Sequence, residues 1–133
     1  MQGMRGLVMG VANERSIAWG IAKAMREAGA ELAFSYQGEA FGKRVAPLAE
    51  SLGSNLLLDV DVTDEASLDA AFAQLKEAWP TMDFLVHAIA YSDKSELTGR
   101  FLNTSRHNFK HSMDISCYSF IEVARRAYPM MKQ

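Results

Sequence analysis

Four short apolar runs alternate with four longer helical patterns along this chain, and no other feature of the sequence limits the fold so strongly. The runs predict strands at residues 5–10, 31–36, 55–61 and 82–90. The first run is too short for a helix and ends at Gly10, as a buried parallel strand commonly does where it enters its loop. Because a helix separates each pair of successive strands, the strands must run parallel, with helices on both faces of the sheet. The expected fold class is therefore a doubly wound parallel α/β sheet.

The patterns between the runs predict four helices. The first follows a cap at Ser16 and stops at Gly29, with apolar positions at Ile17, Ile21, Ala22 and Met25. The second covers residues 39–52, and the third begins with a cap at Thr63 and runs to Trp79. The fourth begins near Ser105, after a polar loop at 91–104, and is the longest element. Its single apolar stripe over about six turns is formed by Phe109, Met113, Cys117, Phe120, Ala124 and Ala127.

Charge and cysteine content exclude several classes of protein. The 14 basic and 16 acidic residues nearly cancel to a net charge of -2 and form no block of one sign, so no nucleic-acid partner is expected. No apolar stretch approaches the roughly 20 residues that cross a bilayer, so no membrane is expected either. A single cysteine, Cys117, cannot form an internal disulfide, and the N-terminus has no signal-peptide pattern. These features favour a cytoplasmic location.

In a sheet of this kind a ligand binds beyond the carboxyl ends of the strands, in the loops after Gly10, Tyr36, Asp61 and Ala90. The first loop places a glycine directly after the strand, where the backbone can turn beside a bulky anion. Free amides at the start of the next helix, with the helix dipole, suit a pyrophosphate. An ordinary βα loop with a glycine turn and a serine cap explains this loop alone equally well.

The segment from Gly10 to Gly20 resembles the cofactor loop of bacterial enoyl-[acyl-carrier-protein] reductases, a divergent branch of the short-chain dehydrogenase/reductase superfamily. Segments that begin at Gly29, Asp61, Asp83 and Asp114 resemble that family in the same order, so the resemblance spans essentially the whole chain. It implies a Rossmann-like sheet that is truncated here after about four βα units. Residues 1–133 are then the N-terminal part of a single dinucleotide-binding domain.

The resemblance further implies an NADH site that is shared among the four loops. The pyrophosphate and the adjoining ribose would be lined by Gly10, Ser16 and Ile17. The adenosine half would be contacted by Gln37, Asp61 and Val62, and the nicotinamide ribose by Ala88, Ile89 and Ala90. The acyl pocket would be bordered by Tyr91 and Ser92.

The residues alone leave plainer interpretations of these positions open. Gln37 is also explained as a surface turn residue before Gly38. Asp61 fits a helix-entry acid, and Asp59 competes with it for the same role. Small residues at 88–90 are equally typical of buried packing at the end of a strand.

As a family member, the full-length protein would use NADH to reduce trans-2-enoyl-[acyl-carrier-protein] to the saturated acyl thioester in type II fatty acid synthesis, as a homotetramer. The family's catalytic tyrosine and lysine would lie beyond Gln133, so no catalytic residue is assigned and residues 1–133 alone are expected to be inactive. Tyr36 with Lys43, and Tyr128 with Lys132, have suitable spacings in unsuitable places. Another short-chain dehydrogenase/reductase and a non-catalytic nucleotide-binding module are the alternatives.

Other chemically reactive side chains are interpreted as structural. His107 and His111 lie one helical turn apart but lack the glutamate of a zinc protease motif, so no metal is expected. His87 lies within a predicted strand and is expected to be a hydrogen-bonded core histidine. Cys117 is expected in the core, and the Met130–Met131 pair in the core or in a subunit interface.

Overall fold

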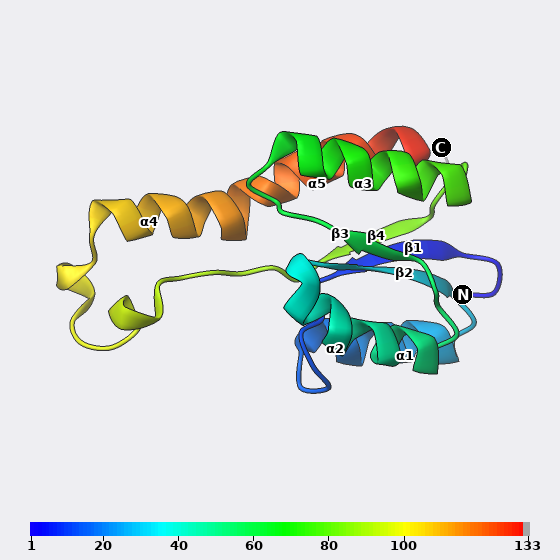
Figure 1. Cartoon of the computed structure of the whole chain (residues 1–133), viewed down its shortest axis with the longest axis horizontal. Helices are drawn as coiled ribbons and strands as arrows, with labels where there is room; N and C mark the ends of the chain where they lie inside the picture. The colour runs from blue at the N-terminus through cyan, green and yellow to red at the C-terminus, as the bar shows by residue number, and fades with distance from the viewer. Residues whose placement is uncertain (132–133) are drawn as a thin grey trace.

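A parallel sheet lies between two layers of helices in the computed structural model, which describes residues 1–131 (Figure 1). Its strands are β1 (Arg5–Met9), β2 (Glu31–Tyr36), β3 (Leu57–Asp59) and β4 (Phe84–His87). Their order across the sheet is β3-β2-β1-β4, and every pairing is parallel. The predicted doubly wound α/β fold is confirmed. The strand order reverses between β1 and β4, so the ligand position of such sheets lies there.

The helices cover both faces of the sheet, as the crossovers require. One face carries α1 (Ile17–Glu27) and α2 (Gly38–Ser51), and the other carries α3 (Glu65–Ala78) and α5 (Ser119–Ala127) (Figure 1). The remaining helix, α4 (Arg106–Met113), projects beyond the sheet together with the loop that precedes it. A segment of π-helix, Asp114–Tyr118, joins α4 to α5.

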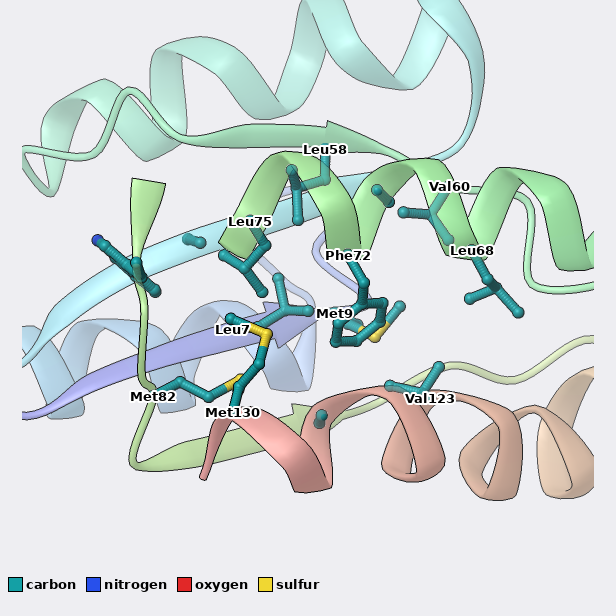
Figure 2. Close-up of a cluster of buried hydrophobic side chains, with 14 residues drawn as sticks. Leu7, Met9, Leu58, Val60, Leu68, Phe72, Leu75, Met82, Val123 and Met130 are labelled. Atoms are coloured by element: carbon teal, nitrogen blue, oxygen red, sulfur yellow. The ribbon is translucent and has the colours of Figure 1, made fainter. Parts of the chain in front are cut away.

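The core is formed by strands that are apolar on both faces. In β1, Leu7 and Met9 pack toward α3 and α5, whereas Val8 packs toward α1 and α2. Figure 2 shows the first cluster, in which Leu7, Met9 and Leu58 of the sheet meet Leu68, Phe72 and Leu75 of α3 and Val123 of α5. Fully burying one such side chain contributes about 1.5–3 kcal/mol, so this cluster fixes both helices on the sheet.

Two strands are shorter than the apolar runs that predict them. The runs at 55–61 and 82–90 give only Leu57–Asp59 and Phe84–His87 as strand. Single backbone bonds continue the pairing slightly, from Val60 N to Tyr36 O (2.7 Å) and from Ala88 N to Met9 O (3.1 Å). Beyond them the chain turns away at the carboxyl edge of the sheet.

The helix caps also differ from the prediction in detail. Asp64 rather than Thr63 caps α3, since its carboxylate accepts a hydrogen bond from Ala66 N. Thr63 instead donates its hydroxyl to Asp61 Oδ1 at 2.7 Å. In α1 the buried face consists of Ala18, Trp19 and Ala22, whereas Ile17 is 80% exposed and its placement on the buried stripe was wrong.

The single apolar stripe predicted for the last helix is wrong. Phe109 is 55% exposed and Phe120 51% exposed, and Cys117 is also exposed rather than buried in the core. Two causes combine: α4 lies outside the sheet, and the π-helix changes the phase between α4 and α5. The face of α5 that reaches the core carries Ser119, Val123 and Ala127.

The chain after α5 returns to the sheet. Met130 is buried and Met131 packs partly against the same cluster, so of the two positions predicted for this pair, core or subunit interface, the structure shows the core. Met130 O accepts a hydrogen bond from Met82 N at 2.8 Å, just before β4. Within residues 1–131, no helix is both long and apolar enough to span a bilayer.

A buried carboxylate fastens α5 to α3. Glu122 accepts hydrogen bonds from the Arg126 guanidinium (2.6 Å), from Arg125 and from the Tyr118 hydroxyl (3.0 Å). Arg126 also donates to Asp69 of α3 at 2.6 Å. The hydrogen bond from Arg126, followed by that from Tyr118, lowers the pKa of Glu122 below its usual value. The carboxylate therefore stays charged and keeps both arginines oriented.

Candidate functional site

A cavity of about 290 Å³ opens at the carboxyl ends of the strands, where the strand order reverses. The segments that follow all four strands contribute to its wall. Seven of the residues proposed from the sequence line it: Gly10, Gln37, Val62, Ala88, Ile89, Ala90 and Tyr91. Four others, Ser16, Ile17, Asp61 and Ser92, are not among the lining residues.

Gly10 brings the loops after β1 and β4 into direct contact. Its φ of +107° lies in a region that favours glycine, and a Cβ placed on it would lie 2.0 Å from Ala88 O. Neither the dihedral angle nor the space admits a side chain. The absence of a side chain also leaves the backbone at this point open to the cavity.

Ser16 shapes the first loop instead of capping α1. It occupies the N-cap position, but its hydroxyl makes no capping bond and accepts from Ala12 N (2.9 Å) and Asn13 N (3.1 Å). Because Ala12 lines the cavity, the hydroxyl of Ser16 fixes the backbone of a segment of the cavity wall. The hydroxyl hydrogen remains able to donate to an anion. Helix α1 begins at the next residue, Ile17, with its positive dipole end at this loop.

The part of the cavity wall that the sequence predicts for adenosine is built from the ends of β2 and β3. Gln37 and Val62 line the cavity, whereas Asp61 turns its carboxylate to its own loop and accepts from Thr63 N at 2.9 Å. This bond matches the helix-entry interpretation of Asp61, and its contact with adenine stays a prediction. The competing acid, Asp59, accepts a hydrogen bond from Gly38 N at 2.9 Å.

Two polar side chains of the last helical region hold the loop after β4. Ser116, in the π-helix, accepts from Tyr91 N (2.9 Å) and donates to Tyr91 O (3.1 Å), so one hydroxyl fixes both backbone groups of a lining residue. Buried Asn108 of α4 donates to Ser92 Oγ at 3.2 Å and accepts from Asp93 N at 2.9 Å. The loop is therefore a defined part of the wall.

Several residues of this site were missed from the sequence. The cavity is also lined by Ser35, Phe41, Val60 and Ile115. Val60 could have been found from its place at the end of β3. Ile115, Ser116 and Asn108 lie far along the chain from the loop that they contact, and no local pattern signals such contacts.

We expect the Ser92→Ala substitution to have only a small effect on the stability of the fold. The change removes one acceptor from Asn108, which keeps its bonds to Asp93 N and Ser112 Oγ. The free energy of unfolding should fall by about 1 kcal/mol or less. Urea unfolding would measure it beside Asn108→Ala, which removes the whole cluster and should cost clearly more. Equal losses in the two variants would contradict this.

His87 is the half-buried histidine at the end of β4, and its hydrogen bonds define its tautomer. Its Nε2 lies 2.7 Å from Ser119 Oγ, and that hydroxyl donates its only hydrogen to Ile115 O at 2.6 Å. Nε2 must therefore carry the hydrogen and donate it to Ser119. The predicted hydrogen bonding of His87 is confirmed, although the ring is only half-buried and not part of the core. Burial lowers the pKa of His87 below 6.5, so the ring is neutral in the folded protein at neutral pH.

We expect a pH dependence of stability that arises from His87. Because its pKa is lower in the folded state, the unfolded chain binds a proton where the folded protein does not. The contribution is complete above pH 6.5 and is lost as the pH falls below that value. Chemical unfolding between pH 7.5 and 5.5 would show the decline, and His87→Gln should reduce it. His107→Gln is the control, since that ring is exposed; an equal reduction there would contradict this assignment.

Other reactive side chains do not gather into a second site. The rings of His107 and His111 stack with centroids 6.1 Å apart, and the described residues contain no cluster of three or more metal-binding side chains. Tyr36 lines the cavity at the end of β2, and Lys43 pairs with Glu39 at 2.7 Å, so they form no catalytic pair. Tyr128 is exposed, and Lys132 lies outside the described residues.

The β3-β2-β1-β4 order, with a glycine turn and a cavity at the reversal point, defines a Rossmann-like α/β protein. A family model for enoyl-(acyl carrier protein) reductase matches residues 10–133. The chain belongs to that family.

Relatives and solved structures agree with this assignment. Enoyl-[acyl-carrier-protein] reductase [NADH] 1 of Rhizobium meliloti is 61% identical over 131 residues, which are 98% of this chain and 48% of that protein. FabI from Candidatus Liberibacter asiaticus superposes with a TM-score of 0.95 at 55% identity, over 97% of this chain and 50% of that one. The reductase from Anaplasma phagocytophilum, solved in complex with NAD, superposes with a TM-score of 0.94 at 54% identity. This match covers 98% of this chain and 50% of that one. The chain thus spans about half the length of these relatives.

Proposed function

We propose that this chain supplies the dinucleotide-binding half of an NADH-dependent enoyl-[acyl-carrier-protein] reductase. The whole protein would reduce a trans-2-enoyl thioester on acyl carrier protein to the saturated thioester in type II fatty acid synthesis. The cavity at the strand reversal, with Gly10 beside Ala88, is the observation that carries this proposal. The relatives named as NADH enoyl reductases, and the NAD complex of the Anaplasma protein, support it.

The residues divide along the cofactor in the order of the loops. Gly10, Ser16 and Ile17 would hold the pyrophosphate and the adjoining ribose, where the α1 dipole favours an anion. Gln37, Asp61 and Val62 would hold the adenosine. Ala88, Ile89 and Ala90 would lie along the nicotinamide ribose, and Tyr91 with Ser92 would border the acyl group.

NADH supplies a hydride, which would pass to C3 of the enoyl thioester, while a proton completes C2. Negative charge develops on the thioester oxygen during this transfer, so a hydrogen-bond donor at that oxygen lowers the barrier. The contribution of this chain is to fix the nicotinamide by backbone contacts at residues 88–90. The hydrogen bonds from Ser116 keep the adjacent Tyr91 backbone in place.

The proposal includes a cytoplasmic homotetramer that acts on acyl carrier protein. Support for subunit contacts comes from apolar side chains left exposed on α4, the π-helix and α5: Phe109, Met113, Tyr118, Phe120 and Ile121. An exposed apolar patch of this kind is typical of a protein interface.

The function is tested by titrating the 133-residue chain with NADH and NADPH. We expect NADH to bind, and NADPH to bind at least about fivefold more weakly, because a 2′-phosphate needs a cationic partner at the end of β2. The nearest lysine along α2, Lys43, is already paired with Glu39 at 2.7 Å. Cofactor fluorescence would give both dissociation constants. Lack of NADH binding would contradict the proposed function, and tighter NADPH binding would reverse the assigned cofactor.

A further inference from the structure

An acidic side chain from β3 occupies the amino end of α2. Asp59 Oδ1 accepts a hydrogen bond from Gly38 N at 2.9 Å, and Asp59 is paired in register with Tyr36 of β2. Gly38 is the first residue of α2 and directly follows Gln37, which lines the cavity. The carboxylate therefore lies at the turn where the cavity meets α2.

Asp59 differs from the neighbouring acidic residue Glu39 because no basic side chain within residues 1–131 neutralises it. Glu39 is neutralised by Lys43 at 2.7 Å, and the Arg44 guanidinium lies 5.8 Å from the centre of the Phe41 ring. Among the described residues, Asp59 makes no ion pair within 4.0 Å, so its charge is not cancelled locally. Exposed backbone amides at the start of a helix attract anions, but here a carboxylate of the protein already accepts from Gly38 N.

We propose that Asp59 is the residue that excludes a 2′-phosphate on the adenosine ribose and so selects NADH over NADPH. This inference rests on the proposed function. In dinucleotide-binding sheets of this class an acid after the second strand contacts the ribose hydroxyl. Here that place holds the uncharged Gln37, and the acid comes from the neighbouring strand.

Asp59 acts in two ways that can be separated. Its carboxylate accepts the hydrogen bond from the Gly38 amide, so that donor is not available to a phosphate oxygen. Its negative charge also opposes a dianionic phosphate beside Gln37. Asp59→Asn keeps a hydrogen-bond acceptor and removes only the charge, whereas Asp59→Ala removes both.

The experiment compares NADH and NADPH dissociation constants for the parent chain, Asp59→Asn and Asp59→Ala. We expect Asp59→Asn to bind NADPH about fivefold more tightly, the scale of one exposed charge interaction, with NADH changed less than twofold. The gain should shrink at 1 M salt, where the Debye length is about 3 Å. Asp59→Ala should gain at least as much NADPH affinity, because the Gly38 amide is also freed.

The control is Glu50→Gln, which removes the same charge from an exposed position near the other end of α2. It should leave the ratio of the two constants unchanged. Circular dichroism would verify that each variant is folded. If the parent binds NADH but both Asp59 variants keep its NADPH affinity, the inference is wrong and the proposed function stands. If the parent binds neither cofactor, the proposed function itself is contradicted.

Discussion

The Gly10→Ala substitution is expected to weaken NADH binding severely and to destabilise the fold. The added Cβ would lie 2.0 Å from Ala88 O, a backbone atom that cannot rotate away, and the φ of +107° is unfavourable for alanine. To relieve the overlap, β1 and β4 must separate where they pair beside the cavity. We expect a loss of about 3 kcal/mol or more in the free energy of unfolding. NADH affinity should fall at least about a hundredfold, since a separation of the two loops disrupts the part of the cavity that we propose for nicotinamide.

Gly99→Ala provides the matched control. Gly99 has a φ of +96°, but a Cβ there would have no atom within 4 Å. This variant suffers only the dihedral cost, about 1 kcal/mol, and should bind NADH normally. Urea unfolding and fluorescence titration of both variants separate strain from overlap. Similar losses in the two proteins would show that contact with Ala88 is unimportant.

The second large effect concerns catalysis. We expect the 133-residue chain to bind NADH and yet give no measurable reduction of a crotonyl thioester. The side of the cavity assigned to nicotinamide is lined by Ala88, Ile89, Ala90, Tyr91 and Ile115. Of these, Tyr91 alone is ionisable, and within the described part of the chain no lysine lines the cavity. The proposed reaction requires a hydrogen-bond donor at the thioester oxygen and a fixed nicotinamide, and the family resemblance implies that a lysine at the ribose provides the second.

NADH oxidation at 340 nm would follow the reaction, with the Rhizobium meliloti relative assayed alongside as a positive control. Turnover by the 133-residue chain at roughly 1 s⁻¹ or more would contradict the expectation, since that rate is typical of a complete enzyme. Tyr91→Phe would then show whether Tyr91 is the donor. Loss of the rate with unchanged NADH affinity would assign it that role.

The parts of the fold that were predictable are those set by local pattern. The bounds of β2 matched the predicted 31–36, because a fully buried parallel strand appears as a continuous apolar run between turn residues. Strands β3 and β4 were extended too far, since apolar residues such as Val60 and Ile89 line the cavity after the pairing ends. Hydrophobicity marks burial or contact, but it does not show which backbone groups are paired.

The site divided in a similar way. Gly10 followed from its position at the end of the first predicted strand, where sheets of this topology bind their ligands, whereas Ala88 followed only from the family resemblance. The hydrogen-bond partners of the Ser16 hydroxyl depend on the path of its loop. They could not be predicted from the presence of a serine at this position. Ser116 and Asn108 were missed because their partners lie 25 and 15 or 16 residues earlier, where helical periodicity carries no information.

The π-helix between α4 and α5 rotates the side chains of α5 around the helix axis relative to those of α4. Each residue of a regular α-helix advances the side chains by about 100°, and one wider turn introduces an extra residue. Ile115 and Ser116 can therefore face the cavity and its loop while Val123, farther along the same continuous helix, faces the sheet. Deleting one residue between Asp114 and Tyr118 would restore a uniform helix, and it would rotate one of these two surfaces out of register with its neighbour. The length of this segment is thus as constrained as its composition.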